Sequence, residues 1–494
     1  MIFRSTFWLN SIAATLALTL LGACGFAGDE DQVRVTVVED GDARINPVGT
    51  RLNFASSTMR AAIAKGLVGL DEEGRVVPAL AARWIVTDDG LSYIFRLFDG
   101  KWDDGREITA ERVARLLRER LAELRNSRLR DDVTAVDEVV SMTGRVIEIK
   151  LKAPHPNFLQ LLAQPEMGLF RAGHGAGPMR LLDEKNGIKL GQFDQPSQDE
   201  QEAGAEDERW VSLRAEPAAT AIARYRAGGT QIVLNGKYHH LPLVEAADIS
   251  SGDLRLDPVA GLFGLRFIRA KGFWAVPANR EILAMAINRP ALLTSFPGVS
   301  AWQSRLKIIP EALDVEGIDT YPDWASMTME ARIVFARNHV SRWKASEGPV
   351  APLTIALPDA AGARILIKRI QSDLRRVGLE ARMVGSNEAA DVELMDEIAP
   401  YDSAPWFLKQ FTCARTTVCL NDADAKIAEA DAATNLQIKA SLYAEVEDML
   451  VDHYNFIPIA VPIRWSIARP GRRAFAVNPR GWHPLNPLVG IPIS

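Results

Sequence analysis

The three cysteines are the residues of this chain with the most distinctive covalent chemistry. Cys24 follows Leu21-Gly22-Ala23, at the end of an apolar run from Ile12 to Leu21 that is too short to be a permanent membrane anchor. Small residues directly before a cysteine resemble the bacterial lipobox, where a signal peptide is removed and the thiol receives a diacylglyceryl group. The pattern predicts that Cys24 is lipidated, which would hold the protein at a membrane surface. A plain secretory signal with an unrelated cysteine is the alternative.

The other two cysteines, Cys413 and Cys419, lie close together in the sequence, with five residues between them. A chain that is exported to an oxidising compartment favours a disulfide between such neighbours. Two free thiols are the alternative. A zinc site would need further ligands nearby, and this segment supplies none.

Histidines and catalytic motifs give no sign of a metal centre or an active site. His239 and His240 are adjacent, so on a strand their side chains would point apart, and we expect a surface turn before Pro242. The sequence has no H-E-x-x-H and no G-x-S-x-G motif. We therefore predict a protein without catalytic residues, cofactor or metal.

Composition places the chain among globular proteins with no nucleic-acid partner. The chain has 494 residues, a formal net charge of −6 and 47% hydrophobic residues. A negative net charge gives no reason to expect a nucleic acid. After Cys24, no apolar run reaches the roughly 18 residues of a transmembrane helix. The length is too great for one core and predicts two or three domains.

Predicted strands and helices alternate along the chain. Sequence patterns typical of strands occur at 33–38, 91–97, 145–151, 353–356 and 379–384. Thr109 can cap a helix whose apolar stripe includes Val113, Leu117 and Leu121, and helical spacing recurs over 365–377. This alternation predicts an α/β architecture. Residues 194–208 carry seven carboxylates and predict a solvated loop.

Three stretches resemble the dipeptide- and oligopeptide-binding proteins, solute-binding family 5. The first reads VPALAARW at 77–84, DDGLSYIFRL at 88–97, DGKWDDG at 99–105 and ITAERV at 108–113. It is similar to the family signature P-x-L-A-x-x-W, D-D-G-x-x-Y-x-F-x-L-R, W-H-D-G and T-A-x-D-V. The second and third are the stretches 280–289 and 442–462. The resemblance covers roughly residues 33–480.

The resemblance implies a type II periplasmic-binding-protein fold, an α/β fold of two lobes joined by hinge strands, with an extra subdomain in the first lobe. We expect hinges near 259–264 and 462–467, and closure around a solute. The expected boundaries are a lipoprotein signal peptide at 1–23, a tether at 24–32, a first-lobe core at 33–62, 172–262 and 465–494, an extra subdomain at 63–171, and a second lobe at 263–464.

The sequence departs from the family where peptide-binding members hold the peptide's α-amino group. Those members carry an aspartate in a Trp-x-x-Asp segment, and here the aspartate position falls at Ala399 and the tryptophan position at Asp396. Either Asp396 or Asp402 binds a positive amine from a shifted position, or the ligand is not an ordinary peptide. The alternative for these carboxylates is a set of solvated loop charges. The predicted ligand-binding residues are Asn46, Trp302, Asp396, Asp402, Trp406 and Trp465, and for the tryptophans a core position is the alternative.

The resemblance implies a solute-binding lipoprotein on the periplasmic side of the cell envelope. Its expected partners are a peptide or another small polar solute, the permease subunits of an ABC importer, and a membrane through the lipid anchor. We expect a monomer. The alternative is a sensing or structural envelope lipoprotein of the same fold, without a cognate permease.

Overall fold

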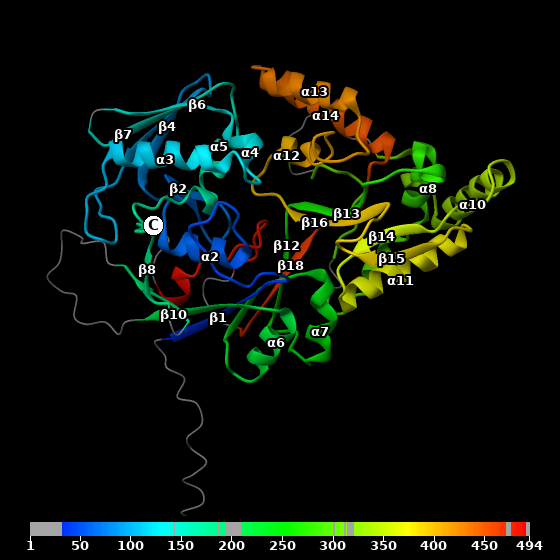
Figure 1. The fold of residues 1–494 in the computed structure, drawn as a ribbon, viewed down its shortest axis with the longest axis horizontal. Helices are drawn as coiled ribbons and strands as arrows, with labels where there is room; N and C mark the ends of the chain where they lie inside the picture. The colour runs from blue at the N-terminus through cyan, green and yellow to red at the C-terminus, as the bar shows by residue number, and fades with distance from the viewer. Residues whose placement is uncertain are drawn as a thin grey trace, which may run out of the picture.

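The computed structural model describes residues 32–142, 144–184, 187–193, 209–299, 302–310, 313, 321–470 and 476–490. Cys24, the signal peptide and the tether up to residue 31 lie outside the described residues, as does the acidic segment 194–208. The described chain forms three bodies, each built on its own main sheet (Figure 1).

The first body is built on a seven-stranded sheet in the order β12-β18-β11-β1-β10-β9-β8. Its strands are β1 (Gln32–Val38), β8 (Met179–Asp183), β9 (Ile188–Gln192), β10 (Trp210–Glu216), β11 (Ile232–Gly236), β12 (Leu254–Pro258) and β18 (Ile463–Ala468). β1 is parallel to both β10 and β11. Val33, Val35 and Val37 alternate along β1 and pack against α2 (Phe54–Ile63), which covers one face. α6 (Ala218–Arg226) and α7 (Leu241–Ala246) flank the other side (Figure 1).

The second body is an antiparallel four-stranded sheet in the order β4-β5-β7-β6. Its elements are β2 (Val68–Leu70), β3 (Val76–Pro78), β4 (Ala81–Val86), β5 (Ser92–Leu97), α3 (Ala110–Leu124), α4 (Arg130–Val133), β6 (Val136–Ser141), β7 (Val146–Leu151), α5 (Phe158–Leu162) and the 3-10 turn η1 (Pro165–Met167). The Thr109 side chain caps α3 by accepting from the Arg112 amide, and Val113, Leu117 and Leu121 are buried. The predicted capped helix is confirmed.

The third body is a five-stranded sheet in the order β15-β14-β16-β13-β17. Its strands are β13 (Gly261–Phe267), β14 (Leu353–Leu357), β15 (Ala381–Gly385), β16 (Val392–Ile398) and β17 (Phe456–Ala460), and its helices are α8 (Pro277–Ala286), α9 (Arg289–Leu293), α10 (Met329–Ser346), α11 (Ala361–Arg376), α12 (Ala404–Lys409), α13 (Asn421–Ala432) and α14 (Leu436–His453). β14, α11 and β15 form a βαβ unit, in which the two strands are parallel. The strands and the helix predicted over 353–384 are confirmed.

Two neighbouring chain crossings join the first and third bodies. The chain passes from β12 into β13 and returns from β17 into β18. The crossings touch, because the Val259 amide donates to the Pro462 carbonyl at 2.9 Å. Both lie in the segments where we expect hinges. A pair of short adjacent connections is the arrangement that lets two bodies rotate about one axis.

We propose the expected domain boundaries for this molecule. Each sheet falls inside one of the expected segments, except that β1 begins one residue early and β13 and β18 begin two residues early. The extra subdomain is then the body of β4 to β7, and the second lobe is the body of β13 to β17. These names are used below.

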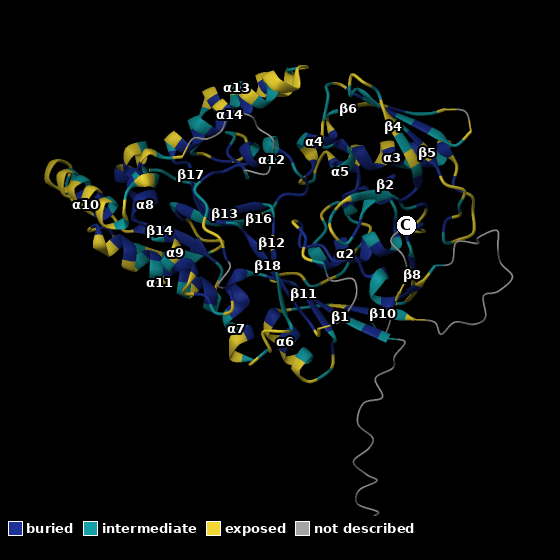
Figure 2. Ribbon diagram, turned by 180° about the vertical axis from the view of Figure 1, so that it is seen from behind, coloured by how far each residue is buried: buried dark blue, intermediate teal, exposed yellow. Residues whose placement is uncertain are grey.

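Burial follows the layers of the fold. The strands of the seven- and five-stranded sheets are largely buried, whereas α10 and α13 show exposed outer faces (Figure 2). None of the helices in the described part of the chain is both long enough and apolar enough to cross a bilayer.

Candidate functional site

A cavity of about 680 Å³ lies between the extra subdomain and the second lobe. The subdomain contributes α4, α5 and the chain that follows β7, and the second lobe contributes α12, α13 and α14. The lining includes the carboxylates Asp131, Asp132, Asp402 and Asp431, and the cations Lys152, Lys409 and Lys439. A cleft of this size between two bodies, with a few charged groups, is typical of a site for a small polar solute.

Asp132 is the most perturbed carboxylate of this cavity. It is a buried residue of α4, and burial raises its pKa to about 6, against the effect of a hydrogen bond from Tyr401. Burial likewise lowers the pKa of His155, another lining residue, to about 4. The cavity wall thus holds groups whose charge depends on pH in the acidic range.

Asp402, a predicted ligand-binding residue, lines this cavity but has partners of its own. Its carboxylate pairs with the Arg480 guanidinium, whose side chain is 7% exposed. Its backbone amide donates to Gln160 Oε1 at 2.8 Å, and Gln160 Nε2 donates back to Asp402 Oδ2 at 3.2 Å. Arg480 Nη1 also donates to the carbonyl of Ala399 at 3.4 Å. Asp402 thus connects the second lobe to α5 and to the C-terminal segment.

Asp396 is paired as well, in a more buried position on β16. Its Oδ1 lies 2.7 Å from Arg464 Nη1, and the side chains of Arg464 and Asp396 are only 5% and 13% exposed. Arg464 Nη2 donates to the Asp396 carbonyl at 3.1 Å. Since Arg464 lies on β18, this pair bridges the two large sheets beside the chain crossings. Its neighbour Glu397 is exposed, but the surrounding protein and the Asp396 charge raise its pKa.

The structure places the three predicted tryptophans in two different settings. Trp302 is buried, donates from Nε1 to the Val461 carbonyl at 2.6 Å, and lies edge-on to Phe263 with a centroid distance of 5.2 Å. Trp465 is fully buried and donates to the Lys237 carbonyl at 2.9 Å. Trp406 is half-buried on α12. Trp302 and Trp465 therefore occupy core positions next to the crossings.

Asn46, the remaining predicted site residue, is exposed in the loop between β1 and α2. Its side chain accepts a hydrogen bond from the Val48 amide at 3.2 Å, and its own amide donates to Ser56 Oγ at 2.9 Å. These bonds shape the loop and do not bring Asn46 to Asp396 or Asp402. Ligand binding by the six residues stays a prediction.

The histidine pair differs from the expected surface turn. His239 and His240 lie in a 3-10 turn at 238–240 after β11 and are buried. Each residue of such a turn advances by about a third of a circle, so adjacent side chains do not oppose each other. Both rings face Asp40, at 3.4 and 2.8 Å from Oδ1, and Lys237 Nζ lies 2.8 Å from Oδ2.

These contacts form a hydrogen-bond network at the carboxyl ends of β1 and β11. Burial would raise the pKa of Asp40, but the hydrogen bonds from His239 and His240 hold it well below its usual range. The Lys237 amide donates to His240 Nδ1 at 3.3 Å, which places the His240 proton on Nε2, facing the carboxylate. A nitrogen that carries a proton is not free to bind a metal ion.

The arginine partners of the two aspartates were not anticipated from the sequence. Asp396 and Arg464 are 68 residues apart, and Asp402 and Arg480 are 78 residues apart. No periodic pattern links residues at such separations. The resemblance to the family drew attention to the carboxylates alone.

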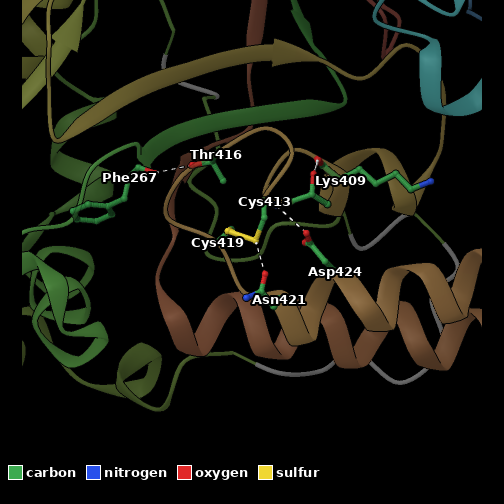
Figure 3. Close-up of a disulfide and its surroundings, with 8 residues drawn as sticks. Phe267, Lys409, Cys413, Thr416, Cys419, Asn421 and Asp424 are labelled. Carbon is green, nitrogen blue, oxygen red and sulfur yellow. Dashed lines mark hydrogen bonds between the residues drawn. A yellow bond between two sulfur atoms is a disulfide. The ribbon is translucent and has the colours of Figure 1, made fainter.

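The predicted disulfide between Cys413 and Cys419 is confirmed (Figure 3). It closes the loop between α12 and α13, and its Cα atoms are 5.1 Å apart. The Cys413 amide donates to Asp424 Oδ2 at 3.0 Å, and Thr416 Oγ1 donates to the Phe267 carbonyl at 3.3 Å (Figure 3). The disulfide and these bonds fix the loop to β13 and α13.

We expect that replacing Cys413 and Cys419 with alanine lowers the free energy of unfolding by about 2–3 kcal/mol, since a short loop gains little chain entropy when it is released. Guanidinium unfolding of the oxidised protein, the reduced protein and the double variant measures the effect. The reduced protein and the variant should agree, and labelling of the denatured, unreduced protein should find no free thiol at either position. Two labelled thiols would contradict the prediction.

Comparisons with known proteins agree with this architecture. Residues 75–202 match the family described as Bacterial extracellular solute-binding proteins, family 5 Middle. The glutathione-binding protein GsiB of Shigella flexneri serotype 5b is 25% identical over 352 residues, which cover 65% of this chain and 64% of GsiB. The chain therefore spans slightly less than two thirds of that relative's length.

Solved structures show the same fold along nearly the whole chain. OppA of Haemophilus influenzae in complex with RPPGFSPFR has a TM-score of 0.70 at 16% identity, with 92% of this chain and 97% of OppA covered. NikA of Brucella suis in complex with Fe(III)-EDTA has a TM-score of 0.72 at 16% identity, with 93% and 100% covered. The predicted type II periplasmic-binding-protein fold is confirmed.

The family consists of solute-binding proteins and not of enzymes, as the lack of catalytic motifs predicted. The signature at 77–113 lies within the matched range, and the three bodies with two adjacent crossings are the architecture that the resemblance implied. Residues 75–202 of this chain thus match family 5 of the bacterial extracellular solute-binding proteins, and the chain as a whole has the type II periplasmic-binding-protein fold.

Proposed function

We propose that the protein is an extracytoplasmic solute-binding lipoprotein that captures a peptide or a similar polar solute between its lobes and delivers it to an ABC importer. The observation that carries the proposal is the charged cavity of about 680 Å³ between the extra subdomain and the second lobe. The two adjacent crossings supply the hinge, and solute binding would favour the closed arrangement because the solute touches both sides.

The relatives support a small polar solute. GsiB binds glutathione, a peptide, and OppA was solved with a nine-residue peptide. NikA was solved with an iron chelate, so the fold accepts solutes that are not peptides. For this chain we propose a short peptide first, since the curated relative binds one.

A second candidate is a sensing or structural envelope lipoprotein of the same fold. One observation favours it: the carboxylates of Asp396 and Asp402 are already paired with Arg464 and Arg480 of the same chain. A ligand amine at either carboxylate would have to displace a guanidinium. Under this candidate no permease is engaged, and in its structural form the lobes also hold no solute.

Calorimetry with glutathione and with trialanine distinguishes solute capture from the structural form of the second candidate. Solute capture predicts saturable one-to-one binding of at least one of these peptides, together with a smaller radius of gyration in X-ray scattering, because the lobes close. Absence of both effects, also with a pooled extract of small polar metabolites, would favour the structural candidate. A variant with Asp359→Asn, an exposed substitution outside the lining of the cavity, serves as the control for general effects of a substitution.

We expect that Cys24→Ser releases the protein from the membrane, because the serine hydroxyl cannot take the thioether-linked diacylglyceryl group. Fractionation of cells that carry each form should place the wild type with membranes and the variant in the soluble envelope fraction or unprocessed. Globomycin should block processing of the wild type only. Identical processing and membrane retention of both forms would contradict lipidation at Cys24.

A further inference from the structure

A second cavity, of about 630 Å³, lies where all three bodies meet, and arginines dominate its lining. The first lobe contributes residues 50–52 of the loop between β1 and α2, the subdomain contributes residues 126–130 and η1, and the second lobe contributes the disulfide loop. The lining arginines are Arg51, Arg128, Arg130 and Arg415. Positive charge is therefore concentrated in this cavity, although the chain as a whole has a net charge of −6.

Nearby carboxylates neutralise only part of this charge. Glu166, the single carboxylate of the lining, pairs with Arg128 at 2.6 Å. Asp131 is shared by two arginines, Arg415 at 2.7 Å and Arg130 at 3.3 Å. The Arg51 side chain makes no hydrogen bond or ion pair with any residue that the structure describes. The cavity therefore has an excess of guanidinium groups.

The wall also contains an unpaired buried acceptor. Glu166 is 2% exposed, and while its Oε1 accepts from Arg128, its Oε2 is buried without a hydrogen-bond partner in the described chain. An acceptor left unpaired away from water costs free energy. A hydrogen-bond donor carried by a solute, such as an amide N–H, would remove that cost.

We propose that this cavity is the subsite for an anionic group of the solute, a carboxylate or a phosphate, bound chiefly by Arg51 and Arg130. The inference rests on the proposed solute-binding function and names the solute class. The planar guanidinium binds carboxylate and phosphate oxygens in pairs, which gives direction as well as affinity. For a peptide, this group is the C-terminal carboxylate.

The position of the arginines couples anion binding to closure. Arg51 belongs to the first lobe, Arg130 to the subdomain and Arg415 to the second lobe. The Arg415–Asp131 ion pair already joins the last two bodies across the cleft. An anion between these arginines touches all three bodies, so it stabilises the closed arrangement relative to the open one. The disulfide of residues 413 and 419 holds the loop that presents Arg415.

The test compares ligands that differ only in the anionic group. Calorimetry with trialanine and with its C-terminal amide, and thermal shifts with inorganic phosphate against chloride at equal ionic strength, are measured on the full protein. We expect the amide to bind at least tenfold more weakly than the acid. If the peptides fail but phosphate binds through the arginines, the anion subsite stands and the peptide function is wrong.

Variants of the lining arginines test whether these residues bind the anionic group. Arg51→Gln with Arg130→Gln should weaken trialanine or phosphate binding at least tenfold and leave trialanine amide unchanged. Arg96→Gln, an exposed substitution on β5 outside the cavity, should change neither. Equal binding of acid and amide by the wild type, an equal loss for both in the double variant, or binding of neither anion through these arginines would overturn the proposal.

Discussion

Asp396→Asn should lower the free energy of unfolding by about 3–5 kcal/mol, the largest effect expected of a single conservative change in this protein. The substitution keeps the shape of the side chain but removes its charge. Arg464, whose side chain is 5% exposed, would then hold a positive charge between two sheets with no carboxylate partner. The loss of stability arises mainly from this buried, uncompensated charge and not from the lost attraction between the two groups.

Chemical denaturation of three variants tests this. Asp359→Asn removes an equally simple pair with Arg364, but those side chains are 79% and 57% exposed, so its effect should stay below about 1 kcal/mol. Replacing both partners of the buried pair, Asp396→Leu with Arg464→Met, should recover much of the loss. If Asp396→Asn is as mild as Asp359→Asn, the buried bridge between the sheets does not exist in solution.

Asp132→Asn should make the protein more stable at neutral pH, by on the order of 2–3 kcal/mol. Burial raises the pKa of Asp132 to about 6 in the folded chain, above the ordinary value of 3.8. Between these two values the folded state binds more protons than the unfolded state, so wild-type stability falls as pH rises from about 4 to about 6. Asparagine cannot ionise and therefore removes this loss.

The measurement is the unfolding free energy of the wild type and of Asp132→Asn at several pH values between 4 and 8. The difference between them should be small near pH 4 and reach its full size above pH 7. Other carboxylates titrate in the same range, so the difference, and not the wild-type curve alone, reports Asp132. Asp137→Asn, exposed on β6 of the same subdomain, is the control. A difference that does not vary with pH would show that Asp132 is ionised normally.

Much of the fold could be predicted because its elements have local signals. The strand at Gln32–Val38 is a run of β-branched residues, and α3 begins at a threonine cap and carries one apolar stripe. Such patterns depend on neighbours within a few residues. The family signature lies in this scaffold, which explains why it identifies the fold so well and names no solute.

The site could be predicted only in part, because its contacts join distant segments. The acidic stretch at the end of β16 and just beyond it draws attention to Asp396 and Asp402, but nothing local shows that Arg464 and Arg480 neutralise them. Trp302 and Trp465 look the same in sequence whether they wall a cleft or fill a core. The arginines of the second cavity come from three bodies, and only the assembled chain brings them together.

The histidine pair shows a different limit. Adjacent side chains point apart on a strand, and the sequence predicts this for the two histidines, whereas a 3-10 turn brings both rings to Asp40. The local backbone conformation therefore decides whether the two side chains point apart or toward the same carboxylate. The buried network that results lies at the carboxyl ends of the parallel strands β1 and β11.

Native mass spectrometry of protein recovered from a bacterial envelope tests solute capture most directly. The protein is sprayed from volatile buffer, the bound species is released by collision, and its mass and fragments are read. Capture of a peptide or a similar polar solute predicts one molecule per chain, a fragment pattern with a carboxylate or phosphate, and loss of this species in the Arg51→Gln, Arg130→Gln variant. A chain that carries no solute from the envelope, and takes up none when a metabolite extract is added, would contradict the account.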